Sequence, residues 1–291
     1  MLRSASDLAS LLRSDVGAFN AYVAGLRAGT HADLTGADLS GADLRPANIE
    51  GCNLTGANLS ASKAEGSVLV RCRLKGCESV GLEVDAFWRA ILDQIYVLWQ
   101  GSDAWNAFRS VKRPAVLAGV DLSGAKLEGA DLSEVVLTTA RLDGADLRGA
   151  ALTRTDFSQA SLRGTQFGGA TLMFGSFKGA TLTDANFDRA ELRYMNLENS
   201  DFSGPSFENA RIEGGDWTRS VGAGARFDGA HMDGVVLNYA RLSGCSFRGA
   251  RLANCAFIET DVKGACFEGA ELTECLDLAT IEKGVAWMPN P

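Results

Sequence analysis

The chain has 291 residues, with 36 acidic side chains and 28 Lys and Arg side chains, and a formal net charge of −8 at pH 7. This acidic balance disfavours plain binding to nucleic acid or to an acidic membrane surface. No apolar run reaches about 18 residues, so the sequence predicts no membrane-spanning helix. Residues 1–14 have the pattern of an amphipathic helix and not of a signal peptide.

Residues 4–28 have the pattern of two short helices. Ser4 or Ser6 is a candidate N-cap, and Gly29 is a candidate stop. Apolar side chains form one stripe in each predicted helix: Leu8, Leu11 and Leu12 in the first, and Phe19, Tyr22, Val23 and Leu26 in the second. We interpret residues 1–31 as an N-terminal helical cap.

Residues 32–81 contain ten five-residue repeats. The middle residue of each repeat, called here the repeat centre, is mostly Leu, and the residue two places before it, the small position, is mostly Ala or Cys. The pattern weakens at the centre Ala64 and fails at Ser79. This segment is therefore predicted to be a short repeat domain.

Residues 82–119 interrupt the repeats. Val84 to Trp99 carries an apolar stripe at helical spacing, and Gly101 ends it. Ser102 or Asp103 can cap a second helix, which Pro114 stops. Aromatic side chains in this insert form a candidate partner surface if they are exposed, and otherwise pack over the end of a repeat domain: Phe87, Trp88, Tyr96 and Trp99.

Residues 120–274 hold 31 five-residue repeats without an insertion. Sixteen centres are Leu and ten are Phe, and Gly222 is the one centre that is not apolar. Seventeen of the small positions are Ala. A fixed short period of this length indicates a repeat architecture.

A period of five fits neither an α-helix nor an extended strand, which have periods of 3.6 and 2. Alternation of a small and a large apolar residue followed by polar and Gly-rich places favours a very short strand and then a turn. The pattern resembles the pentapeptide-repeat family, whose consensus Ala-(Asp/Asn)-Leu occurs at residues 32–34, 57–59 and 145–147. This resemblance implies an all-β solenoid, a right-handed quadrilateral β-helix with four repeats, hence about 20 residues, per coil.

The aromatic centres support four repeats per coil independently. From Phe157 onward they occupy nearly every second repeat, with Phe202 as the one aromatic centre out of step. In a four-sided coil this spacing places Phe on two opposite faces. We therefore expect like residues to stack on like. With a strand spacing of about 4.8 Å, the nearly eight coils would form a rod roughly 37 Å long.

The insert resembles the N-terminus of the same chain, because residues 19–22 (Phe-Asn-Ala-Tyr) match residues 105–108 (Trp-Asn-Ala-Phe). We interpret this as a duplicated cap followed by a solenoid. A cap is expected because the end of a β-helix exposes backbone groups and an apolar core. Alternatively, residues 82–119 form a side loop of one continuous solenoid. Leu276 to Ala286 is predicted to be a short helix within a C-terminal cap, residues 275–291.

Repeats between Met195 and Gly224 are irregular, since Met195 and Pro205 occupy small positions, Trp217 enlarges a centre and Gly222 empties one. A compensating pair of a bulky and an empty position explains this more simply than a functional site does. A local bulge or bend is expected here.

Few residues carry catalytic chemistry. The two histidines, His31 and His231, lack a plausible triad or metal partner, and no phosphate-binding loop or nucleophile elbow is present. Six of the seven cysteines occupy or continue the small position, which favours buried free thiols in a reducing cytoplasm: Cys52, Cys72, Cys77, Cys245, Cys255 and Cys275. Cys266 lies beside a centre. We expect no enzyme, metal or cofactor, although an enzyme with a site at the caps remains an alternative.

The family resemblance implies a DNA-mimicking protein that protects DNA gyrase or topoisomerase IV. The long repeat domain has 22 acidic and 15 basic residues, a net charge of −7, far below the roughly 22 charges of the same length of DNA. One predicted face is the most acidic, although Arg154, Arg193, Arg211 and Arg251 lie on it too. Its acidic residues are Asp131, Glu134, Glu191, Glu213, Asp233, Glu271 and Glu274. The alternative is an adaptor or scaffold in a bacterial assembly such as a secretion or toxin system. Either function predicts a cytoplasmic protein with a protein partner, and a homodimer stays open.

Overall fold

The structure is a computed structural model that describes residues 3–27, 30–65, 72–80, 82–84, 86–109 and 115–277, without the side chains of residues 86–88 and 90. The chain divides into two compact units. The first comprises Met1–Gln100 with Gly119–Asp121, and the second comprises Gly101–Ala118 with Leu122–Pro291.

Each five-residue repeat is a short extended segment closed by a β-turn, as Thr155 to Gln159 illustrates. The Asp156 side chain accepts a hydrogen bond of 2.9 Å from the Ser158 amide, across the fully buried centre Phe157. Gln159 has φ of 60°, and the Ala160 amide then donates to the Phe157 carbonyl at 2.9 Å. A positive φ at the third turn residue is typical of type II turns and explains why Gly is frequent there. The consensus Asp therefore stabilises the turn through the backbone.

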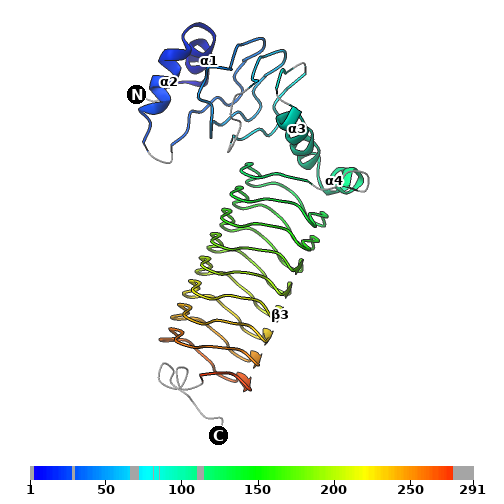
Figure 1. The fold of residues 1–291 in the computed structure, drawn as a ribbon, viewed down its shortest axis with the longest axis vertical. Helices are drawn as coiled ribbons and strands as arrows, with labels where there is room; N and C mark the ends of the chain where they lie inside the picture. The colour runs from blue at the N-terminus through cyan, green and yellow to red at the C-terminus, as the bar shows by residue number, and fades with distance from the viewer. Residues whose placement is uncertain are drawn as a thin grey trace. The chain divides into compact units, whose positions relative to one another are not determined.

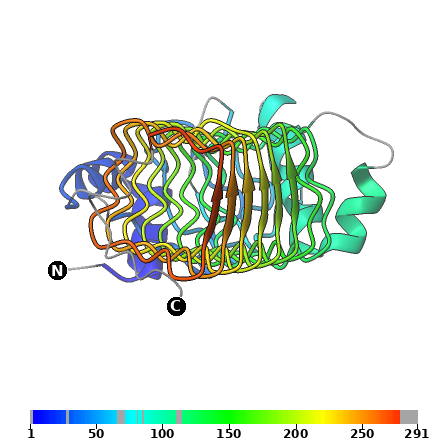
Figure 2. The ribbon, with the colours of Figure 1, turned by 90° about the horizontal axis from the view of Figure 1, so that it is seen from below.

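The repeats wind into a parallel β-solenoid (Figure 1). Four repeats make one coil, so that Asp156 bridges Ser176 in the next coil. In the second unit, eight successive bridges lead from Val116 to Leu276, each advancing by one coil. One side of the solenoid forms a parallel six-stranded sheet. Its strands run side by side and point in the same direction (Figure 2). Its strands are β1 (Thr171–Met173), β2 (Glu191–Arg193), β3 (Arg211–Glu213), β4 (His231–Asp233), β5 (Arg251–Ala253) and β6 (Glu271–Thr273). The predicted fold class is confirmed.

The core of the long solenoid consists of columns of like side chains. Every apolar centre from Leu117 to Phe267 is buried. Phe167 stacks on Phe187 with ring centroids 4.6 Å apart, and this column continues through Phe207, Phe227, Phe247 and Phe267 at 4.7 to 4.9 Å. A second column begins with Phe157 on Phe177, and the two columns meet edge to face. The expected stacking of like on like is confirmed.

The bridged ladders extend slightly beyond the repeats that the sequence indicated. In the first unit Glu83 pairs with Lys63, and Leu82 is buried in a small position, so the solenoid continues past residue 81. In the second unit Val116 already bridges Val136 and Ala115 is buried, so the ladder extends before residue 120. At the other end Leu276 bridges Ala256, which contradicts a helix beginning at that residue. The rest of the predicted C-terminal helix lies outside the described residues.

The described residues include four helices. In the first unit, α1 (Ala5–Ser14) begins with a capping box between Ser4 and Asp7, which confirms Ser4 as the N-cap. The next helix, α2 (Val16–Ala24), ends at Gly25 and not at the expected Gly29. The insert contains α3 (Ala86–Trp99) and α4 (Ser102–Arg109), close to the predicted bounds.

Asn20 and Asn106 make the same contacts with the two solenoids. The Asn20 side chain donates to the Pro46 carbonyl at 2.9 Å and accepts from the Asn48 amide at 2.7 Å. Asn106 donates to the Gly129 carbonyl at 3.1 Å and accepts from the Asp131 amide at 2.7 Å. Both pairs of bonds reach the junction between the third and fourth repeats of a first coil, and the preceding Phe19 and Trp105 are fully buried. These bonds support a duplicated cap. The organisation of the chain as two solenoids, each preceded by its own helical cap, stays a prediction.

The irregular repeats keep a regular backbone, so the expected bulge or bend is wrong. Bridges continue in the same register through Asn196, Asp201 and Val221. Side chains compensate instead. A Cβ atom on Gly222 would lie 2.0 Å from Cε2 of Phe202, whose ring occupies the space above the glycine. The thioether of Met195 similarly lies against Gly175, where an added Cβ would approach its Cε to 3.1 Å.

Candidate protein-interaction surfaces

The acidic residues predicted to share a face do share one. We call it the strand face: β1–β6 together with the equivalent repeats around Leu132 and Leu152. Glu191, Glu213, Asp233 and Glu271 lie on β2, β3, β4 and β6, while Glu134 and Glu274 occupy turns that follow this face, with φ of 61° and 53°. Asp131 is the second residue of its repeat and accepts from the Ser133 amide at 3.0 Å. The face therefore exists, but several coils separate Asp131 and Glu134 from the others.

Opposite charges pair between neighbouring coils along the solenoid. Lys178 pairs with Glu198 at 2.6 Å, Arg148 with Glu128 at 3.2 Å, and Arg226 with Glu208 at 2.9 Å. In each of these pairs the two partners occupy successive coils. Exposed pairs of this kind contribute little stability each, but they neutralise much of the acidic surface.

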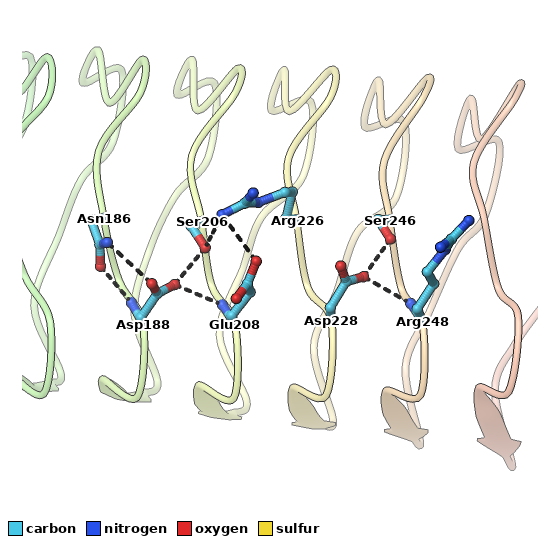
Figure 3. A network of polar contacts seen from close by, with 8 residues as sticks. All are labelled: Asn186, Asp188, Ser206, Glu208, Arg226, Asp228, Ser246 and Arg248. Atoms are coloured by element: carbon cyan, nitrogen blue, oxygen red, sulfur yellow. Dashed lines mark hydrogen bonds and ion pairs between the residues drawn. The ribbon is translucent and has the colours of Figure 1, made fainter.

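Other carboxylates bind the backbone of the next coil, as Figure 3 shows for Asp188 and Asp228. Asp188 accepts from the Ser206 hydroxyl and from the Glu208 amide, the latter at 3.0 Å. Asp228 makes the equivalent contacts two coils later, with the Ser246 hydroxyl and the Arg248 amide. These aspartates hold coils together and are not available as a DNA-like charge array.

On the strand face, the acidic side chains of Glu213, Asp233 and Glu271 contact other side chains. Glu213 lies 3.6 Å from the Arg193 guanidinium and accepts from the Tyr194 hydroxyl at 3.0 Å. The hydrogen bond with Glu213, and its charge, raise the pKa of Tyr194 above its usual value. Asp233 accepts from Asn254 at 2.8 Å, and Glu271 pairs with Arg251 at 3.1 Å. The strand face is therefore mixed in charge.

Two exposed aromatic rings stack at one edge of the strand face. Phe174 and Tyr194 are 53% and 50% exposed, and their ring centroids lie 5.2 Å apart at 9°. Both occupy the turn position with positive φ, 57° and 53°, which bulky residues seldom adopt. Sequence reasoning missed them because it followed charge. Bulky aromatics at a repeat position that is otherwise rich in Gly were the available signal.

The insert aromatics lie on α3. Tyr96 is 65% exposed, and the Lys75 ammonium lies 4.9 Å from the centroid of the Trp99 ring. Both rings line a cavity of about 370 Å³ between α3 and the first solenoid, together with Leu59, Leu74 and Ile95. Within the first unit, Tyr96 and Trp99 are thus brought together. The side chains of Phe87 and Trp88 lie outside the described residues.

The described residues contain no group of three or more His, Cys, Asp or Glu side chains that could hold a metal ion. All seven cysteines are free and five of them are buried, whereas Cys77, predicted to be buried, and Cys266 are half-buried. Burial raises the pKa of the Cys52 and Cys245 thiols to about 12, which keeps them protonated. No described helix is long and apolar enough to cross a membrane.

The profile of pentapeptide repeats matches this chain in eight copies, over residues 30–60, 52–78, 115–154, 140–173, 169–204 and 236–273. The chain belongs to the pentapeptide-repeat family. Its solenoid is a protein-binding repeat fold, and the family is generally not enzymatic. A comparison with curated proteins gave no match.

Three solved pentapeptide-repeat structures are similar to the chain. HetL, involved in regulation of heterocyst differentiation in the cyanobacterium Nostoc sp. strain PCC 7120, is 21% identical, with a TM-score of 0.35, over 88% of this chain and 91% of HetL. QnrB1, a plasmid-mediated fluoroquinolone resistance protein, is 20% identical, with a TM-score of 0.49, over 60% of this chain and 89% of its own. A thylakoid-lumen protein of Arabidopsis thaliana is 30% identical, with a TM-score of 0.24, over 35% of this chain and 71% of its own.

Proposed function

We propose that this pentapeptide-repeat protein is a non-catalytic scaffold that binds a protein partner along the strand face. The stacked pair Phe174 and Tyr194 carries this proposal. Two exposed rings held in a backbone conformation that disfavours them contribute nothing evident to the fold. Exposed aromatics beside charged groups are typical of the residues that dominate protein interfaces.

The mixed charge of the strand face supports a scaffold over a DNA mimic. A DNA mimic requires acidic side chains that are free to replace phosphates, whereas Glu213 and Glu271 pair with arginines. Protection of DNA gyrase or topoisomerase IV is the second candidate. The acidic excess of the long solenoid, 22 acidic against 15 basic residues, favours this second candidate. Glu191 is one of these acidic residues.

Site-specific crosslinking tests the scaffold proposal. A photoreactive residue in place of Phe174 should trap one defined partner, whereas the same residue at exposed Arg163, on another face, should not. The purified partner should bind Phe174→Asn and Tyr194→Asn variants roughly 30-fold more weakly, the loss typical of interface hot spots. Asn tolerates positive φ, so these variants keep the turn.

Tyr239→Asn is the matched control, because Tyr239 is 46% exposed at the same repeat position, with φ of 61°, on a different face. Equal trapping at Phe174 and Arg163, or equal losses in all three Asn variants, would contradict the proposal. A gyrase supercoiling assay with and without a fluoroquinolone tests the second candidate. DNA mimicry requires inhibition of gyrase, or its rescue from the drug, at roughly micromolar protein.

A further inference from the structure

The middle of the strand face has two rows of side chains that depart from the charge pairing seen elsewhere. On one edge, three successive strands present Arg211, His231 and Arg251, which are direct neighbours in the sheet register. On the other edge Glu213 lies directly beside Asp233. Glu213 and Asp233 carry like charges, which destabilise a sheet when they lie opposite each other. Neither row alternates basic with acidic residues, although such alternation from coil to coil is frequent on this solenoid.

A shallow groove of about 220 Å³ runs between the two rows across β3, β4 and β5. The exposed Arg211 and His231 side chains contact no partner among the described residues. Arg251 pairs with Glu271, at the end of its row. The basic edge of the groove therefore offers donors to an acidic ligand.

At the acidic edge of the groove, Gly214 and Gly234 directly follow Glu213 and Asp233 and carry no side chains of their own. The Tyr194 ring lies against Gly214. A molecule bound in the groove can therefore also contact the aromatic pair Phe174 and Tyr194, which lies beyond the end of the groove formed by β3.

We infer that this groove binds an α-helix of the partner, lying along the solenoid axis, with a stripe of Asp or Glu facing Arg211, His231 and Arg251. This inference rests on the proposed scaffold function. Successive coils are about 4.8 Å apart, close to the roughly 5.4 Å rise of one helical turn. Acidic residues spaced three and four apart on a helix therefore match three successive strands. In an extended peptide, residues on one side are about 6.8 Å apart and lose register by the third strand.

The test uses the full-length protein and a labelled, alanine-based helical peptide. The peptide carries three glutamates, the second four residues after the first and the third three residues after the second. A lysine follows each of the first two glutamates. Fluorescence anisotropy at low ionic strength, where screening is weak, should show saturable binding. Replacing the glutamates with glutamine should abolish it. A proline-interrupted peptide of the same charge should also fail to bind, because it cannot form the helix.

Arg211→Glu should weaken binding about fivefold, since it removes one attraction and adds one repulsion. Arg241→Glu is the matched control, because exposed Arg241 occupies the same repeat position on another face. A peptide with lysines in place of the glutamates should bind Arg211→Glu better than it binds the unchanged protein.

Absence of helical-peptide binding overturns the inference, and so does equal binding by the two variants. Either result leaves the crosslinking test at Phe174 unaffected. Conversely, a failed crosslink together with specific peptide binding would remove the proposed aromatic contact and retain the groove. The two failures are therefore distinguishable.

Discussion

Gly222→Ala tests whether Phe202 and Gly222 form a compensating pair. The added Cβ would lie 2.0, 2.6 and 2.7 Å from Cε2, Cζ and Cδ2 of the Phe202 ring. The ring cannot easily withdraw, because Trp217 and Phe227 lie 5.2 and 6.4 Å from its centroid. No positive φ constrains Gly222, so the clash alone determines the effect. We expect a loss near the upper end of the usual overpacking range, about 3 kcal/mol.

The assay is native-state hydrogen exchange, because a solenoid need not unfold as one cooperative unit. About 3 kcal/mol corresponds to a roughly 100-fold loss of amide protection, which should be centred on the two coils that contain residues 202 and 222. Gly168→Ala is the control, since its Cβ would meet its nearest neighbours at an ordinary 3.7 Å.

Phe202→Leu should rescue Gly222→Ala, because the smaller side chain vacates the overlapping space. The compensating-pair argument is refuted if Gly222→Ala retains full protection, or if the double variant is no more protected than Gly222→Ala alone.

Three further changes have defined outcomes. Asn106→Ala removes two hydrogen bonds to the first coil of the second solenoid and should cost about 1–3 kcal/mol, seen as faster exchange near residue 131 but not near residue 231. Met195→Ala should leave a cavity beside Gly175 and cost about 2–4 kcal/mol, measured by local exchange, and unchanged protection would show that the site collapses. The Arg45 side chain, through its hydrogen bond, lowers the pKa of Asp43 to about 2. The stability from this pair is present above the unfolded pKa near 3.8 and is lost as pH falls towards 2. Asp43→Asn should therefore make the urea-unfolding midpoint of the first unit less dependent on pH over that window.

The fold was predictable because two side chains in five, the small position and the centre, must be buried. Thirty apolar centres in the long repeat, with Phe at alternate positions, determine a four-repeat coil and its stacked core. The ends were harder to predict. Leu82 is larger than the usual residue at a small position, yet it is buried there, so residue type alone did not mark where the ladder stops.

The irregular repeats show how neighbours in sequence differ from neighbours in space. Trp217 precedes Gly222 by one repeat, but the ring over Gly222 belongs to Phe202, one coil earlier. A bulky residue is therefore compensated along a column, and the backbone stays regular.

The candidate surfaces were predictable only in part. The four-repeat period placed Glu191, Glu213, Asp233 and Glu271 on one face correctly, because it assigns every residue to a side of the coil. It did not predict the pairing of Glu213 with Tyr194 or of Asp233 with Asn254, which depends on side-chain conformation across a turn.

The side-chain compensation between coils also bears on how such a chain can change length in evolution. Where the same residue types recur in every coil, as in the column from Phe167 to Phe187, a coil can be gained or lost without disturbing the contacts of its neighbours. Between Gly175 and Gly222 this freedom is lost, because Met195 and Phe202 each require a glycine one coil away. Insertions and deletions of whole coils are therefore expected to accumulate outside this stretch, which would keep a constant order while the rest of the solenoid varied in length.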